Sequence, residues 1–79
     1  MVKEEDMPHI DINMFAGRDD ETKKKVAEAV VETMMKELGC AREHLSVAVH
    51  DFDPAEWDEK IADKIDEAKV YAGKVFRNK

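Results

Sequence analysis

A long apolar stripe between two alternating segments constrains the fold of this chain more than any other feature. From about residue 20 to Leu38, apolar residues recur at spacings of three, four and one, which is typical of one face of an α-helix. They are Val26, Ala27, Val30, Val31, Met34, Met35 and Leu38. Residues 9–15 and 44–52 instead alternate apolar and polar side chains, which predicts two strands. We therefore predict a strand–helix–strand unit, whose right-handed crossover joins parallel strands.

The residues on either side of the stripe mark where the first helix begins and ends. Gly17 can take a positive φ in the preceding turn, and Asp19 or Asp20 can cap the helix N-terminus. Gly39 follows the last apolar residue, as expected for a C-terminal stop. We expect the Met34-Met35 pair in the core. Cys40 is expected to be a small buried or half-buried hydrophobe.

Residues 53–68 predict a second helix. Asp53 is a suitable N-cap, and Pro54 occupies the first helical position, where proline is favoured. An apolar line follows at Trp57, Ile61, Ile65 and Ala68. The pattern of residues 69–79 leaves three alternatives open: a short hairpin, a strand that reaches a partner, or a frayed helix end.

Composition and charge exclude several classes of function. The net charge is −6 and no basic run exceeds "KKK", so nucleic acid is not expected as a partner. No apolar segment approaches the roughly 18 residues of a membrane span, and the N-terminus lacks a signal pattern. We expect a cytoplasmic protein without a membrane partner, since the single cysteine is compatible with a reducing compartment. "HDFD" at 50–53 offers a lone His with acids, which is too weak a pattern to predict a metal site.

The small size of the chain predicts self-association. Seventy-nine residues form one domain that is marginal alone. One cysteine cannot form an intrachain disulfide, and no Cys/His set has the spacing of zinc ligands. A two-stranded sheet also leaves strand edges unpaired, which invites pairing with another chain. The simplest solution is a homodimer whose two sheets join into one.

Two stretches of the sequence resemble a known family. "PHIDINMFAGRDDETKKKVAEAVVETMMKEL" and "SVAVHDFDPAEW" are similar to the small tautomerases of the 4-oxalocrotonate tautomerase superfamily, in particular the PptA-type branch. The likeness covers roughly residues 7 to 65. It implies an α/β (α+β) tautomerase-like fold over residues 8–79, preceded by an N-terminal extension at residues 1–7. It also favours a dimer over a hexamer.

The resemblance implies that Pro8 is the general base and acid of a cofactor-independent tautomerase, an enol–keto isomerase of small 2-oxo acids. An amino-terminal proline is a secondary amine that can titrate near neutral pH, whereas a peptide-bonded proline has no basic nitrogen. Met7 precedes Pro8 in this sequence. Three explanations stay open: Met7 is the start used in the cell, the extension is clipped, or the extension is retained. In the last case the alternative is a noncatalytic oligomeric module with a blocked Pro8.

The resemblance also implies a substrate site. Arg18 matches a substrate-binding arginine of the family and suits a carboxylate, because its planar fork binds bidentately. Ala48 occupies the position of a second arginine, which argues against dicarboxylate substrates. Phe52 and Trp57 correspond to an apolar pocket wall, which fits a monocarboxylate with an aryl tail such as phenylenolpyruvate. His50 is a further candidate for orienting the substrate.

Residue type alone favours simpler roles for some of these residues. Pro8 is then better explained as the first residue of a strand, and Arg18 fits a solvated turn as well as a carboxylate site. Phe52 and Trp57 are better explained as core or dimer-interface residues than as substrate contacts.

Overall fold

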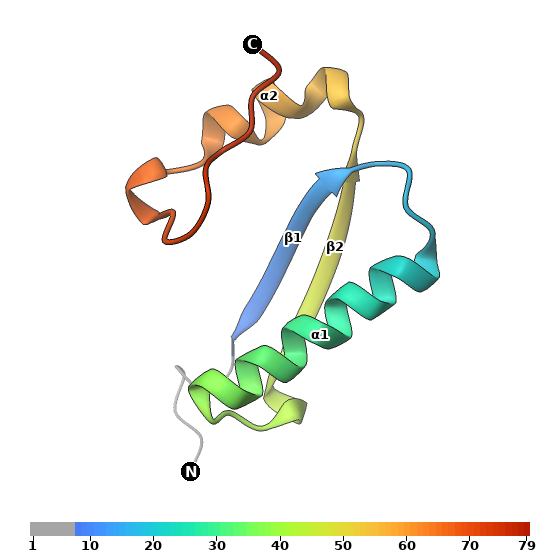
Figure 1. Cartoon of the computed structure of the whole chain (residues 1–79), viewed down its shortest axis with the longest axis vertical. Coiled ribbons are helices and arrows are strands. Elements are labelled where there is room, and N and C mark those ends of the chain that lie inside the picture. Colours follow the sequence, from blue (N-terminus) through green and yellow to red (C-terminus); the bar gives the residue numbers. More distant parts are fainter. Residues whose placement is uncertain (1–7) are drawn as a thin grey trace.

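Two parallel strands form the centre of the structure, a computed structural model that describes residues 8–79 (Figure 1). Strand β1 spans His9–Phe15 and strand β2 spans Ser46–Phe52, and they pair in register from His9 opposite Ser46 to Phe15 opposite Phe52. The strand predicted over 44–52 starts two residues too early. Residues Arg42–His44 instead form a 3₁₀ turn, in which Leu45 N donates to Arg42 O at 3.0 Å.

Helix α1 spans Asp20–Leu38 and connects the two strands, as the apolar stripe predicts. Asp19 is the N-cap, because its carboxylate accepts a hydrogen bond of 2.8 Å from Thr22 N. Gly39 ends the helix with a φ of +70°, and its N–H donates to Met35 O at 2.9 Å. Both predicted boundaries of the helix are confirmed.

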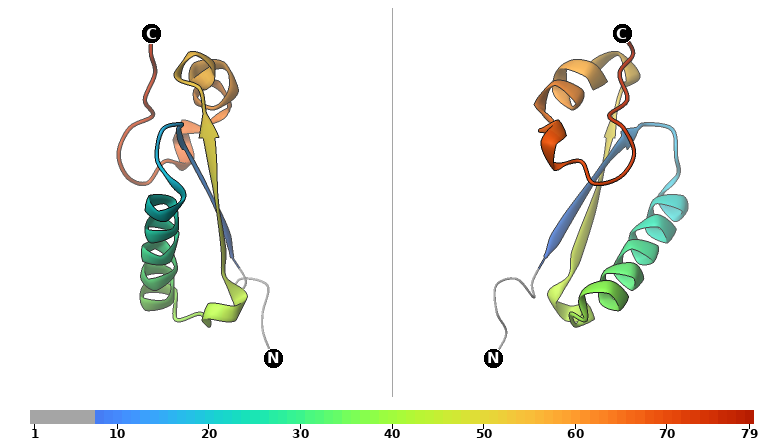
Figure 2. Two further views of the ribbon diagram at one scale, coloured as in Figure 1. Left: turned by 90° about the vertical axis from the view of Figure 1, so that its right-hand side faces the viewer. Right: turned by 60° about the vertical axis from the view of Figure 1, so that its left-hand side comes forward.

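Helix α1 covers one face of the sheet, and α2 lies at the C-terminal ends of the strands (Figure 2). In the register of the pair, Ile10 lies opposite Val47 and Ile12 opposite Val49. Asp51 shares their face and forms an ion pair with Lys23 of α1, so this apolar face is the one that α1 covers. The opposite face carries polar side chains near the start of both strands.

The second helix predicted over 53–68 is wrong as one continuous element. The segment consists of a 3₁₀ turn at Pro54–Glu56, helix α2 at Trp57–Lys60, and further 3₁₀ turns at Ala62–Lys64 and Glu67–Lys69. Asp53 caps the first turn as predicted, with its side chain accepting from Ala55 N. Helix α2 ends at Lys60, and Ile65 already has an extended backbone. Asp66 caps the last of the 3₁₀ turns, because its side chain accepts from Ala68 N.

The C-terminal tail forms neither a hairpin nor a helix end. After Glu67–Lys69 it turns at Gly73, which has a φ of +72°, and runs back past α2 without regular structure (Figure 1). Trp57 Nε1 donates to Phe76 O at 2.9 Å and holds the returning chain beside α2. Within the described residues, the sheet contains β1 and β2 only, so the tail adds no strand to it.

Few side chains are fully buried. Among residues 8–79, the buried hydrophobic residues are Val31, Cys40 and Ala62. Cys40 is thus buried as predicted, with Sγ 3.7 Å from Met34 O. Met34 and Met35 are only half-buried and Leu38 is 57% exposed, because the apolar stripe of α1 is wider than two strands can cover. The extension predicted at residues 1–7 lies outside the described residues. No described helix is long and apolar enough to cross a membrane.

Candidate active site

An aromatic cluster forms where the two strands end. Phe15 is the last residue of β1, Phe52 the last of β2, and Trp57 the first of α2. The Trp57 ring meets Phe15 edge-to-face, with centroids 5.2 Å apart, and meets Phe52 in the same manner at 6.3 Å. The C-terminal edge of parallel strands is where open α/β sheets commonly bind ligands. The cluster therefore supplies an apolar wall at a suitable edge.

Arg18 lies beside this cluster, in the turn between β1 and α1. Its Nη1 donates to Phe15 O at 3.2 Å, which holds the guanidinium close to the end of β1. A guanidinium carries five N–H donors, so most remain for a ligand. Arg18 lines a hollow of about 280 Å³ together with Met14, Phe15, Trp57 and Phe76. The arrangement offers a fixed cation next to aromatic surface.

Phe76 is the member of this hollow that sequence reasoning missed. Its ring lies edge-to-face with Phe15, at a centroid distance of 5.6 Å. The apolar pair Val75-Phe76 is visible in the sequence. Nothing in an irregular tail, however, indicates where the chain returns in space. No local sequence signal could have placed Phe76 next to Arg18.

Pro8 lies at the other end of β1 from Arg18. It is half-buried, and its carbonyl oxygen accepts a hydrogen bond of 3.4 Å from Ser46 N. Strand β1 has seven residues, which at a rise of about 3.3 Å each separates its two ends by roughly 20 Å. A single copy of the chain therefore does not bring Pro8 and Arg18 to the same small molecule.

His50 belongs to a separate polar group on the sheet face that α1 leaves open. Its Nε2 lies 3.0 Å from Asp11 Oδ1, and His9 Nε2 lies 2.9 Å from the same oxygen. His9 Nδ1 in turn lies 2.6 Å from Ser46 Oγ. Hydrogen bonds from His50 and then His9 lower the pKa of Asp11 below its ordinary value. His50 does not line the hollow at Arg18.

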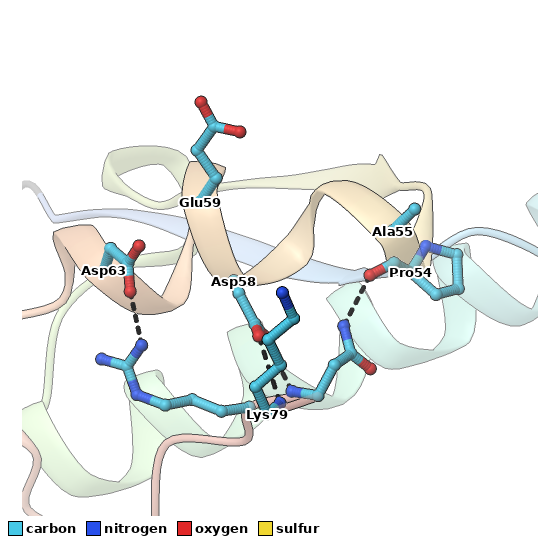
Figure 3. A pocket seen from close by; sticks show the side chains of 8 residues that line it. Pro54, Ala55, Asp58, Glu59, Asp63 and Lys79 are labelled. Carbon is cyan, nitrogen blue, oxygen red and sulfur yellow. Dashed lines mark hydrogen bonds and ion pairs between the residues drawn. The ribbon is translucent and has the colours of Figure 1, made fainter.

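A larger hollow of about 630 Å³ lies under the end of the tail (Figure 3). Its lining is mainly charged, and the charges are used within the protein: Arg77 pairs with Asp63, and Asp58 accepts from the backbone of Asn78. None of the residues predicted from the sequence as site residues lines it. We regard it as the anchor of the tail. Among residues 8–79, no group of three or more His, Cys, Asp or Glu residues is arranged to hold a metal ion.

Comparison with known proteins agrees with this fold. The family model described as "Tautomerase enzyme" matches residues 8–58. Tautomerase PptA of Pectobacterium atrosepticum is 37% identical over 60 residues, which cover 75% of this chain and 79% of that protein. A probable tautomerase of Xylella fastidiosa is 34% identical over 55 residues, covering 70% of this chain and 67% of that protein. The chain therefore belongs to the tautomerase family.

Solved structures confirm the tautomerase-like architecture. A 4-oxalocrotonate tautomerase isozyme from Methylibium petroleiphilum superimposes with a TM-score of 0.61 and 34% identity, over 63% of this chain and 81% of that one. TomN, a 4-oxalocrotonate tautomerase homologue of the tomaymycin biosynthetic pathway, gives a TM-score of 0.61 at 26% identity, over 63% of this chain and 77% of its own. The predicted fold and the resemblance to PptA-type tautomerases are both confirmed. At the level of the family, this supports an isomerase.

Proposed function

We propose that this protein is a cofactor-independent tautomerase of small 2-oxo acids that carry an apolar tail. In this proposal Pro8 acts as general base and acid once its nitrogen is freed. Arg18 binds the substrate carboxylate and Trp57 forms part of the apolar wall, while Phe52, which does not itself line the hollow, packs edge-to-face against the Trp57 ring. His50, which lies outside the hollow, is not needed for the proposed chemistry.

The observation that carries the proposal is the position of Arg18 at an aromatic-lined hollow. A planar guanidinium binds a carboxylate through two parallel hydrogen bonds. The neighbouring rings of Phe15 and Trp57 provide apolar surface for the rest of the molecule. Ala48 supplies no second cation on the sheet, which favours a monocarboxylate over a dicarboxylate.

The proposed reaction moves one proton and consumes nothing else. The free amine of Pro8 accepts the proton from the enol oxygen while the carbonyl forms. The electrons of the carbon–carbon double bond then take a proton at the adjacent carbon, from the ammonium of Pro8. Arg18 stabilises the negative charge that develops on the enolate. A secondary amine that titrates near neutral pH is suited to both steps.

Two copies of the chain are needed to complete such a site. Each protomer has a strand with an edge that is unpaired within the described residues. Antiparallel pairing of such edges places the start of one strand beside the end of the other. Pro8 of one copy then lies near Arg18 of the partner subunit. Because two copies suffice for two sites, we propose a homodimer rather than a hexamer.

The state of the Pro8 nitrogen provides the test. We expect a chain that begins at Pro8 to convert the enol of phenylpyruvate to the keto form, followed by ultraviolet absorbance. A chain that retains Met1, verified by intact mass, should lose this activity because its Pro8 is an amide. Equal rates from both would show that the base lies elsewhere. Inactivity of both would favour the alternative, a noncatalytic oligomeric module.

A further inference from the structure

The last four residues form a strap that is tied to the segment around α2. We define the C-terminal strap as residues 76–79. Asn78 Nδ2 donates to Pro54 O at 2.7 Å, and Asn78 N donates to Asp58 Oδ1 at 2.8 Å (Figure 3). Arg77 forms an ion pair with Asp63 and a hydrogen bond of 3.3 Å to Ala62 O. Every one of these contacts joins the strap to residues 54–63.

The strap fixes the position of the Phe76 ring. Trp57 Nε1 donates to Phe76 O at 2.9 Å, so the backbone of Phe76 is held directly over α2. The ring then packs against Phe15 at an interplanar angle of 80° and lines the hollow that Arg18 lines. The hydrogen bonds that hold this segment are made by the Phe76 carbonyl and by Arg77 and Asn78. The aromatic ring of Phe76 itself can therefore line the hollow.

Phe76 leaves much of its ring for a ligand. The residue is 54% exposed even though it stands at an apolar hollow. An exposed aromatic side chain at the rim of a concave site offers surface that a bound apolar group can cover. Phe76 also lies beyond residues 8–58, the part that matches the family model. The C-terminal tail therefore supplies this part of the wall.

We propose that Phe76, positioned by the C-terminal strap, is a specificity-determining residue that selects carboxylates with an aryl tail over those with a short alkyl tail. The inference rests on the proposed function, since it takes the carboxylate of the ligand to bind Arg18. The aryl group then lies against Phe76 on one side and the Trp57–Phe15 pair on the other. A short alkyl chain would not reach both surfaces.

The full chain permits a binding test that does not depend on catalysis. Trp57 is the single tryptophan and lines the hollow, so its fluorescence reports occupancy. The probes are 3-phenylpropanoate and butanoate. We expect Phe76→Ala to weaken binding of 3-phenylpropanoate about tenfold and that of butanoate less than about twofold. Phe76→Leu keeps an apolar side chain, so its affinity for 3-phenylpropanoate should lie between those of wild type and Phe76→Ala.

Tyr71→Ala is the matched control, because Tyr71 is an aromatic residue of the same tail that is 95% exposed and does not line the hollow. It should leave both affinities unchanged. The proposal would be overturned if Phe76→Ala weakened binding of both acids equally or of neither. It would also be overturned if Tyr71→Ala caused the same loss as Phe76→Ala, or if the wild-type chain did not prefer the aryl acid.

The same measurements separate this inference from the proposed function. If a chain beginning at Pro8 fails to isomerise enols but Phe76→Ala still loses its preference for the aryl acid, the proline chemistry fails and the specificity role stands. If that chain is active and the preference survives Phe76→Ala, the specificity role fails alone.

Discussion

Asp11 shows how one side chain orders the open face of the sheet. It accepts hydrogen bonds from His9 and His50, which belong to different strands, and thereby links β1 to β2 through side chains as well as backbone. These hydrogen bonds favour the ionised carboxylate and lower the pKa of Asp11 below its ordinary value of 3.8. The link therefore contributes to stability only while Asp11 is charged.

This link predicts a defined pH dependence for Asp11→Asn. Because the pKa of Asp11 is lowered in the folded state, its contribution is present above 3.8 and is lost as the pH falls through the lowered pKa. We expect the thermal midpoint of wild type to exceed that of Asp11→Asn at neutral pH, with the gap closing in acid. Thermal denaturation followed by circular dichroism, from neutral pH to below 3.8, measures the two thermal midpoints.

Glu59→Gln replaces an exposed acid of α2 and is the control. The difference between its thermal midpoint and that of wild type should not close in acid in this way. A gap for Asp11→Asn that stays constant into acid would contradict the assignment.

At the scale of the element, α1 owes its start to one side chain. The carboxylate of Asp19 accepts from Thr22 N, and this bond lowers the pKa of Asp19. An N-cap satisfies a backbone N–H that the helix itself leaves without a partner. Asp20 carries the same charge one residue later but lies inside the helix, with a fully solvated side chain.

We expect Asp19→Ala to lower the free energy of unfolding, because the hydrogen bond from Thr22 N to the cap is lost. Asp20→Ala removes the same charge without removing the cap, so it should cost clearly less. Urea denaturation at one fixed protein concentration compares the two, since association shifts the apparent stability. Equal losses in both variants would mean that charge near the helix N-terminus, and not the cap, is what matters.

The segment after β2 shows the limit of reasoning from local pattern. Trp57, Ile61 and Ile65 have helical spacing, yet the helix ends after Lys60. Short isolated helices are marginal, so long-range bonds easily decide between a helix and successive turns. Here Arg77 Nη2 donates a hydrogen bond to Ala62 O, and Ile65 adopts an extended backbone conformation.

At the scale of the whole molecule, the protomer by itself has little core. Val31, Cys40 and Ala62 are the buried hydrophobic residues among those described, and a groove on α1 lined by Val26, Ala29, Val30, Thr33 and Met34 lies open. Burial of apolar surface is the main favourable contribution to folding. We therefore expect the proposed homodimer to gain stability by covering apolar surface of this kind with a second copy.

The proposed site, shared between two protomers, predicts that two inactive chains restore activity to each other. In the proposal, a chain that retains Met1 lacks the base because its Pro8 is an amide, and a chain beginning at Pro8 with Arg18→Ala lacks the carboxylate ligand, so each chain alone should be slow. In hybrid dimers, the free Pro8 of one chain meets Arg18 of the partner subunit at one of the two sites. Random association makes half of the dimers hybrid, so we expect about a quarter of the wild-type rate. The Arg18→Ala chain begins at Pro8, and the chain with intact Arg18 keeps Met1, as verified by intact mass.

Co-refolding of the two variants, with hybrids verified by native mass spectrometry, provides the measurement. The separately refolded variants, mixed without exchange, are the control and should stay slow. Hybrids that form but recover no activity would show that Pro8 and Arg18 do not share a site across the dimer.

The sequence by itself determined the strand–helix–strand unit. Alternation over 9–15 and the stripe ending at Leu38 are visible in the order of side chains along the chain. The helix start at Asp19 and its end at Gly39 are local as well, because their hydrogen bonds join residues a few positions apart. The resemblance to tautomerases rests on the same stretch. Of the candidate site, Arg18, Phe52 and Trp57 were predicted from the sequence, and the structure brings them to one edge of the sheet.

Only the tertiary structure decided the rest. The broken second helix, the strap and the place of Phe76 depend on bonds such as those from Trp57 to Phe76 and from Asn78 to Pro54, which span 19 and 24 residues. No periodicity encodes such contacts, since they form between irregular segments. The separation of Pro8 from Arg18 by the length of β1 likewise follows from the path of the chain in space. Pro8 and Arg18 belong to one stretch that is continuous in sequence, but the structure places them at opposite ends of β1.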